Sequence, residues 1–163
     1  MKIAVMSDSH DRIDHIQTAL TQIEGEAEVL VHCGDYCAPF MLHELVKFSG
    51  PVHGAFGNVD GDIFLMTRFA DASENLTLHH PMGELTVADR RIAFTHYPRM
   101  AYGLAATGQY DAVFYGHTHD FKYETVGKTL LVNDGEIMGR KGRPCFVIYD
   151  TETGQAEQRF VVV

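Results

Sequence analysis

Five short apolar runs in this chain are each followed directly by side chains that could bind metal ions or carry out acid–base chemistry. In chain order these segments are Asp8-Ser9-His10, Gly34-Asp35, Gly57-Asn58, His96 and Gly116-His117-Thr118-His119. Carboxylate, imidazole and amide oxygen together favour borderline to hard divalent cations such as manganese, iron, zinc or nickel. Oxygen ligands alone would have indicated magnesium or calcium, and thiolates would have indicated structural zinc. The residue types therefore predict a divalent metal centre.

Seven ligand side chains are more than one tetrahedral ion needs, but they suffice for two ions that share a carboxylate. The seven are Asp8, His10, Asp35, Asn58, His96, His117 and His119. Asp35 stands alone on its segment and is the predicted shared ligand. Two divalent ions roughly 3.5–4 Å apart are the standard device for in-line displacement at phosphorus. The pattern therefore predicts phosphoester hydrolysis.

The apolar runs that precede these residues have the length and composition of β-strands. They are Lys2–Met6, Val29–Cys33, Val52–Phe56, Arg91–Thr95 and Ala112–Tyr115. Between the first three runs, apolar residues recur at helical spacing over residues 13–23 and 41–46. Strands that alternate with helices predict a parallel α/β sheet, in which ligands bind outside the carboxyl ends of the strands. The seven side chains are therefore expected to converge there.

The sequence also predicts how the first helix begins. Asp11 is expected to cap the helix over residues 13–23, with Asp14 favourably placed in its first turn. His15, within that helix, is expected at the surface or partly buried.

The rest of the chain is richer in predicted strands. Residues 76–80, 84–87 and 91–95 are separated by turn-like segments, and two hairpins are expected, over residues 121–132 and 145–162. Residues 61–75 are expected to form a packed helix or flap, and residues 100–107 a short helix. The overall prediction is two mixed β-sheets packed together, with helices on the outer faces.

Length and charge bound the remaining possibilities. A chain of 163 residues is expected to form one domain, spanning residues 1–163. Its formal net charge of −9 disfavours a general nucleic-acid binder, although a nucleotide could still be a substrate. No apolar run is long enough to cross a membrane, and no signal-peptide core is present before Asp8, so a cytoplasmic protein is expected.

The ordered motifs resemble those of the calcineurin-like metallophosphoesterase superfamily, and the short chain with Gly57-Asn58-Val59-Asp60 is similar to its YfcE-type phosphodiesterases. The resemblance implies a four-layer αββα sandwich with a dinuclear site whose bridging hydroxide attacks the phosphorus. Mn²⁺ is the expected metal. It assigns one ion to Asp8, His10, Asp35 and His119. It assigns the other to Asp35, Asn58, His96 and His117. Among these, Asp35, Asn58 and His96 are the predicted catalytic residues.

The chain departs from the family pattern in two places. Where many members carry a histidine after Asn58, this chain has Val59, which removes a residue thought to assist the leaving group and favours activated esters. Asn133-Asp134-Gly135-Glu136 stands where related chains often have Asn-Pro-Gly-Ser. Extra carboxylates beside the site would repel a dianionic phosphate more than a monoanionic diester. Arg12 is a predicted phosphate contact.

Three functions remain open at this point. The leading one is a phosphodiesterase acting on a small or activated diester. A phosphomonoesterase or nucleotide hydrolase would use the same site. A non-catalytic interaction scaffold of the same fold is the alternative from another class, and it predicts eroded metal ligands, whereas all seven positions are intact here. A homo-oligomer is compatible with each.

Overall fold

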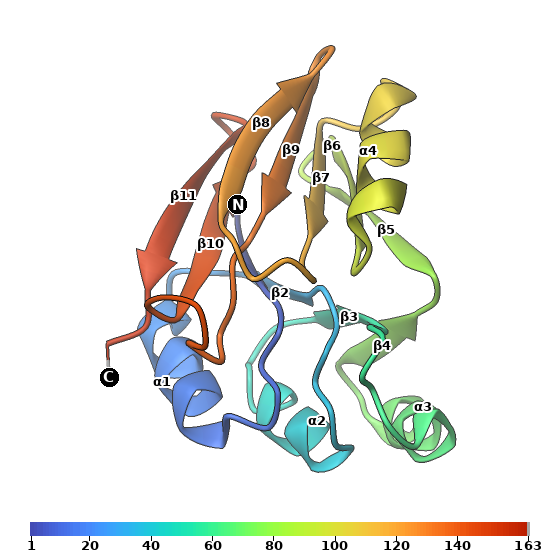
Figure 1. The fold of residues 1–163 in the computed structure, drawn as a ribbon, viewed down its shortest axis with the longest axis vertical. Coiled ribbons are helices and arrows are strands. Elements are labelled where there is room, and N and C mark those ends of the chain that lie inside the picture. The colour runs from blue at the N-terminus through green and yellow to red at the C-terminus, as the bar shows by residue number, and fades with distance from the viewer. Residues whose placement is uncertain (163) are drawn as a thin grey trace.

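In the computed structural model, which describes residues 1–162, two β-sheets pack face to face (Figure 1). The first sheet has the strand order β11-β10-β1-β2-β3-β4. Its strands are β1 (Lys2–Met6), β2 (Val29–His32), β3 (Val52–Ala55), β4 (Leu76–His79), β10 (Cys145–Asp150) and β11 (Gln155–Phe160). Strands β1 to β4 run parallel to one another, and the β10–β11 hairpin joins β1 in antiparallel fashion.

The second sheet has the strand order β5-β6-β7-β9-β8. Its strands are β5 (Met82–Val87), β6 (Arg90–Thr95), β7 (Ala112–Tyr115), β8 (Lys122–Val126) and β9 (Thr129–Asn133). The three inner strands β6, β7 and β9 are parallel, while β5 and β8 pair at the two edges in antiparallel fashion. Both sheets are therefore mixed.

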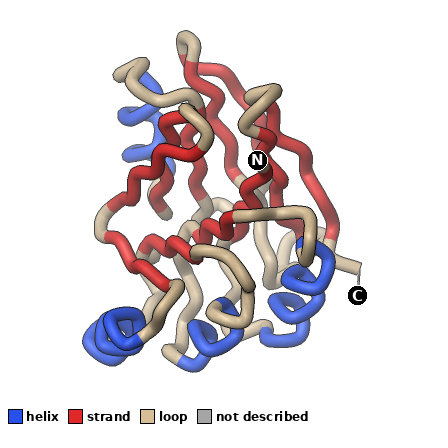
Figure 2. The backbone as a smooth tube through the Cα atoms, turned by 180° about the vertical axis from the view of Figure 1, so that it is seen from behind, coloured by secondary structure: helices blue, strands red, loops and turns tan. Residues whose placement is uncertain are grey.

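Helices cover the outer face of each sheet (Figure 2). The helices are α1 (Ile13–Ile23), α2 (Phe40–Leu45), α3 (Ile63–Ala72) and α4 (Pro98–Ala106). Helices α1 to α3 lie on the first sheet, and α4 lies on the second. The predicted four-layer αββα arrangement is confirmed. No helix within residues 1–162 is long and apolar enough to cross a membrane.

Strand β1 shows how the layers are specified by the sequence. Ala4 and Met6 pack in the core beneath the helices, while Ile3 and Val5 pack between the two sheets. Successive side chains of a strand point to opposite faces, and both faces are buried here, so the strand is apolar from Ile3 to Met6. Strands β2 and β7 are also buried on both faces, which is why they appear in the sequence as mainly apolar runs, with His32 as the polar exception in β2.

Two local expectations about α1 are wrong. Asp11 does not cap the helix: its Oδ1 atom instead accepts a hydrogen bond of 2.9 Å from the backbone N–H of Ala38, tying together the loops that follow β1 and β2. His15 is buried, and its Nδ1 atom lies 2.7 Å from the carbonyl oxygen of Ile137. In both cases the partner belongs to a segment distant in sequence, so local pattern could not reveal it.

The chain between β4 and β5 also differs from expectation. Residues 81–83 were expected to form a turn between neighbouring strands, but β5 begins at Met82. Because β4 belongs to the first sheet and β5 to the second, this short connection carries the chain across the sandwich.

Helix α3 confirms the helical alternative for residues 61–75, and only one side of it packs on the core. Met66 is fully buried, whereas its neighbour Leu65 is 48% exposed. We expect Met66→Ala to lower the free energy of unfolding by about 2–4 kcal/mol, because it leaves a cavity under the helix. Leu65→Ala is the matched control and should change it by less than about 0.5 kcal/mol. Urea unfolding checks both, and equal losses would contradict this packing.

Candidate metal centre

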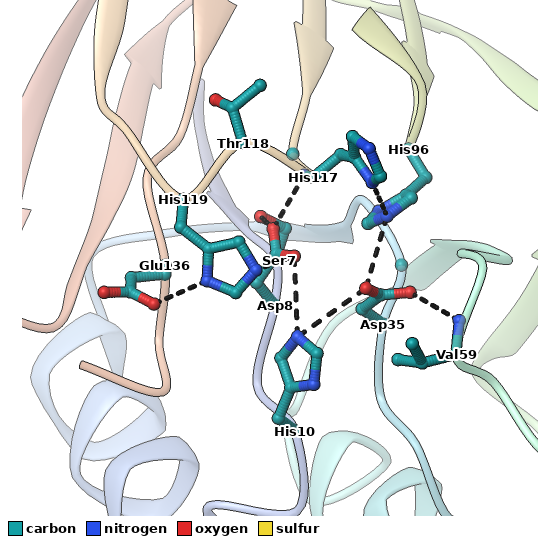
Figure 3. Close-up of polar contacts among 12 residues, drawn as sticks. Ser7, Asp8, His10, Asp35, Val59, His96, His117, Thr118, His119 and Glu136 are labelled. Carbon is teal, nitrogen blue, oxygen red and sulfur yellow. Dashed lines mark hydrogen bonds and ion pairs between the residues drawn. The ribbon is translucent and has the colours of Figure 1, made fainter. Parts of the chain in front are cut away.

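The seven predicted ligands lie at the carboxyl ends of β1, β2, β3, β6 and β7, or in the loops that directly follow these strands. Figure 3 shows six of them, Asp8, His10, Asp35, His96, His117 and His119, turned toward a common centre. Residues that are more than 100 positions apart in the sequence meet there, as in the contact of His119 with Asp8. The sheet topology therefore brings the whole predicted set together.

One group of atoms surrounds Asp8. Its Oδ1 atom lies 3.7 Å from His10 Nε2 and 3.2 Å from His119 Nε2. Both Asp8 Oδ1 and His10 Nε2 are buried, and neither has a hydrogen-bond partner among the described residues 1–162. Buried polar atoms are almost always paired. The side chains of Asp8, His10 and His119 are close enough together to hold one metal ion, and these two orphaned atoms fit such an ion.

A second group surrounds His96. Its Nδ1 atom lies 2.9 Å from the carbonyl oxygen of Cys33, and since a carbonyl can only accept, Nδ1 carries the hydrogen. In the neutral ring Nε2 then has only a lone pair to offer. Around Nε2 lie Asn58 Oδ1 at 3.0 Å, His117 Nδ1 at 3.1 Å and Asp35 Oδ2 at 3.3 Å. A cation bound between these oxygen and nitrogen atoms would fit this arrangement.

Asp35 connects the two groups. Its Oδ2 atom lies 3.6 Å from His10 Nε2 and 3.3 Å from His96 Nε2, so it faces both. Its Oδ1 atom accepts a hydrogen bond of 3.1 Å from the backbone N–H of Val59. The carboxylate of Asp60 in turn accepts hydrogen bonds from the backbone N–H groups of Gly57, Cys37 and Asp35. This arrangement fixes the orientation of Asp35 through its backbone and one of its oxygens.

The protonation tendencies of the cluster reflect closely packed carboxylates and imidazoles. Burial alone would raise the pKa of Asp8, but the neighbouring His10 imidazole and a hydrogen bond from Ser7 lower it below the usual value. Burial would also raise the pKa of Asp35, but the contact with His96 lowers it. The neighbouring Asp8 carboxylate raises the pKa of His10. The carboxylates thus stay ionised and draw positive charge, from protons or from metal ions.

Backbone conformation also sets this centre apart. Five of the seven predicted ligands have positive φ angles, a conformation that residues other than glycine rarely adopt: Asp8 (52°), His10 (41°), Asp35 (61°), His117 (73°) and His119 (62°). Each such residue costs of order 1–3 kcal/mol and persists where the surrounding structure imposes it, typically at functional sites. The left-handed residues turn the chain sharply just beyond each strand, which aims the side chains inward.

Glu136 is a member of this site whose contact with a ligand the sequence analysis missed. Its Oε2 atom lies 2.6 Å from Nδ1 of His119, and its Oε1 atom accepts hydrogen bonds from the backbone N–H groups of Lys141 and Gly142. A carboxylate that accepts from one ring nitrogen of a histidine fixes the tautomer and presents the other nitrogen to a metal. Nothing local in the sequence connects Glu136 with His119, because the pairing arises only when the loops after β7 and β9 meet.

The two carboxyl groups of residues 133–136, which the sequence analysis places beside the site, are both in contact with protein partners. Glu136 is buried against His119, and Asp134 is fully buried behind Ser7. Arg12 donates to both carboxylate oxygens of Asp14 and to the carbonyl of Met138. Its contact with a substrate phosphate stays a prediction.

Comparisons with known proteins agree with this geometry. Residues 1–154 match the model of the calcineurin-like phosphoesterase superfamily domain. The chain is 30% identical to phosphodiesterase MJ0936 of Methanocaldococcus jannaschii, over 100% of this chain and 99% of that protein. It is 25% identical to the probable metallophosphoesterase YsnB of Bacillus subtilis, over 98% and 90% of the two chains.

Solved structures show the same fold. That of an archaeal phosphodiesterase, 30% identical, matches with a TM-score of 0.89 over 98% of this chain and 99% of that one. Vps29 of Chaetomium thermophilum, 16% identical, matches with a TM-score of 0.71 over 98% and 95% of the chains, which shows likeness of fold alone. The strand-end ligands, the four-layer sandwich and the match over nearly its whole length together show that this chain belongs to the calcineurin-like phosphoesterase superfamily.

Proposed function

We propose that this protein is a metal-dependent phosphodiesterase that hydrolyses a small or activated phosphodiester with the help of two divalent cations. The observation that carries the proposal is the position of Asp35 Oδ2. It lies 3.6 Å from His10 Nε2, which has no hydrogen-bond partner within residues 1–162, and 3.3 Å from His96 Nε2, around which Asn58 Oδ1 and His117 Nδ1 also gather. The family uses divalent metal ions. A relative that is 30% identical over the whole chain bears the name phosphodiesterase, which supports the diester as the substrate class.

The residues divide into two overlapping sets. Asp8, His10, Asp35 and His119 would hold one cation, and Asp35, Asn58, His96 and His117 would hold the other. When bound, two such ions lower the pKa of a water they share and stabilise negative charge on phosphate oxygens. Mn²⁺ is the proposed metal, since imidazole, carboxylate and amide ligands suit it. Asp35 fixes the relation of the two sets, and His96 is oriented by its hydrogen bond to the Cys33 carbonyl.

Two features of the cluster favour diesters with good leaving groups. Its seven predicted ligand side chains include no lysine or arginine, so none of them would offset the extra charge of a dianionic monoester beside Asp8 and Asp35. Asp60, which follows the position where many relatives have histidine, directs its carboxylate to three backbone N–H groups. Held there, Asp60 is not free to donate a proton to a leaving oxygen.

Removal and return of metal is the direct test. After chelation and gel filtration, we expect the protein to cleave neither bis-p-nitrophenyl phosphate nor p-nitrophenyl phosphate. Added Mn²⁺ should restore cleavage of the diester, at a rate at least about tenfold above that of the monoester, which corresponds to about 1.4 kcal/mol in activation free energy. A faster monoester reaction would indicate a phosphomonoesterase. Bound Mn²⁺ without cleavage of either ester would favour the scaffold.

Asp35→Asn tests the shared ligand. The amide removes the charge that faces both groups, so we expect loss of bound Mn²⁺ and, with it, a fall in diesterase activity of at least about 100-fold. Metal content by mass spectrometry and activity should fall together. The control is Asp71→Asn on the exposed face of α3, which should change neither. Full activity in Asp35→Asn would overturn the assignment.

Glu136→Gln tests the support of His119. Glutamine has one acceptor oxygen, so it cannot accept both from His119 and from the backbone N–H groups that Glu136 serves. We expect the affinity for Mn²⁺, measured by calorimetric titration of the metal-free protein, to fall roughly 10–100-fold. ¹⁵N NMR should show the hydrogen on Nδ1 of His119 in the parent protein. Exposed Glu74→Gln is the control, and an unchanged affinity of Glu136→Gln would contradict the role.

A further inference from the structure

The segment 133–136, where the chain departs from the family pattern, also places a second carboxyl group behind the candidate metal centre. Asp134 follows β9, and its side chain is fully buried. Its Oδ1 atom lies 2.5 Å from the hydroxyl oxygen of Ser7. Ser7 is itself fully buried and directly precedes the ligand Asp8. This contact joins the loop after β9 to the loop after β1.

The Ser7 hydroxyl group lies between two carboxyl groups but has a single hydrogen to donate. The Ser7 hydroxyl oxygen lies 2.5 Å from Asp134 Oδ1 and 2.5 Å from Asp8 Oδ2, with the carbonyl oxygen of Gly135 more distant at 3.4 Å. A serine hydroxyl has one hydrogen and can donate to only one of two carboxylates. Two ionised carboxylates at this distance would leave one contact without a hydrogen, so one of the two acids supplies it.

The surroundings decide which acid keeps its proton. Asp8 Oδ2 also accepts a hydrogen bond of 2.9 Å from the backbone N–H of His117, and Asp8 Oδ1 faces His10 and His119. These contacts favour ionised Asp8. Asp134 has weaker support: within residues 1–162 its Oδ2 atom is buried without a hydrogen-bond partner, and the further donor beside its carboxyl group, the thiol of Cys33, is a weak one. An unpaired buried carboxylate oxygen costs far more than the carbonyl oxygen of a neutral acid.

The titratable groups that face Asp134 do not change this conclusion. They are the thiols of Cys33 and Cys145, the carboxylate of Asp8 and, at longer range, His96. Burial raises the pKa of both thiols, which keeps them neutral. Burial, and after it the charge of Asp8, raises the pKa of Asp134 itself well above the usual value, against the opposing influence of Ser7.

We propose that Asp134 is a permanently neutral carboxylic acid that donates its proton to Ser7 and thereby commits the Ser7 hydroxyl to donate to Asp8. Asp134 is then a positioning residue: it acts on the metal ligand through Ser7. With Oδ2 of Asp8 held by Ser7 and by the His117 N–H, Oδ1 stays turned toward His10 and His119. The effect on metal binding rests on the proposed function, whereas the protonation of Asp134 does not.

Gly116 supports this arrangement from the other side. A Cβ atom at position 116 would lie 2.4 Å from the Ser7 hydroxyl oxygen and 2.5 Å from Asp8 Oδ2. The chain after β7 therefore closes directly over the Ser7–Asp8 contact, and Ser7 has no room to rotate toward solvent. The side chains of Asp134, Ser7 and Asp8 thus form a buried series of hydrogen bonds.

Infrared spectroscopy and Asp134→Asn test the proton. In metal-free protein at about pH 8, where ordinary carboxyls are ionised, we expect the band of a protonated carboxyl group that is missing in Asp134→Asn. The native state keeps the proton of Asp134 and the unfolded state releases it. The unfolding constant of the parent protein should therefore rise relative to that of Asp134→Asn by roughly tenfold per pH unit above the unfolded pKa. Exposed Asp89→Asn is the control and should show neither effect.

Mn²⁺ affinity tests the positioning. Asparagine can still hydrogen-bond Ser7, so Asp134→Asn should bind Mn²⁺ within about threefold of the parent protein. Leucine cannot, so Asp134→Leu should bind roughly 10–100-fold more weakly. Absence of both the protonated band and the pH effect would contradict the proposal that Asp134 is neutral. An affinity for Mn²⁺ in Asp134→Leu equal to that of the parent protein would contradict its positioning role. If the parent protein itself bound no Mn²⁺, the proposed function would fail, while the infrared result would still decide the state of Asp134.

Discussion

The geometry of the site depends on one carboxylate, that of Asp35, which faces the predicted ligands His10 and His96 at once. Hydrogen bonds therefore fix its loop. The carboxylate of Asp60 accepts from the backbone N–H groups of Asp35, Cys37 and Gly57. The backbone N–H of Val59 donates to Asp35 Oδ1, the oxygen that points away from the centre. Gly57 is required by the same contact, since a Cβ atom there would lie 2.0 Å from Asp35 Oδ1. The loop after β3 thus shapes the loop after β2.

A second consequence concerns charge. Placing carboxylates and imidazoles this close is unfavourable unless a proton or a metal ion lies between them. In the surrounding structure, several neighbouring groups form hydrogen bonds with these carboxylates and imidazoles. Glu136 accepts from His119, the Cys33 carbonyl accepts from His96, and Ser7 donates to Asp8. Each partner occupies the outward atom of a ligand, so that the inward atom keeps a lone pair. Inward lone pairs without hydrogens are what a cation site requires.

The two-sheet sandwich provides the rigidity for this arrangement. Strands β1, β2 and β7 are buried on both faces, so the points at which they end are fixed by packing. The ligands come from short loops with left-handed residues directly beyond those ends. Strain of this kind is tolerated where the adjoining strands cannot move, which explains why the unusual backbone angles of Asp8, Asp35 and His119 lie next to the best-packed strands.

Most of the fold could be predicted from the sequence, and so could the convergence of the seven predicted ligands, because both depend on local signals. Buried parallel strands appear as apolar runs, and the residue after each run falls at the carboxyl edge whatever the details of packing. Helix α1 and the β8–β9 and β10–β11 hairpins follow from periodicity and turn residues in the same way. The family resemblance rests on these local motifs as well.

The tertiary structure decided what surrounds the ligands. Asp11 binds Ala38 instead of capping its helix, His15 is buried with its ring against the carbonyl oxygen of Ile137, and Glu136 and Asp134 contact His119 and Ser7. Each of these contacts joins segments that are separated in the chain, up to 127 positions in the case of Ser7 and Asp134. The hydrogen-bond partner of a side chain depends on which loops the packed sheets bring together. Such long-range pairings produce no local pattern in the sequence, so the sequence does not predict them.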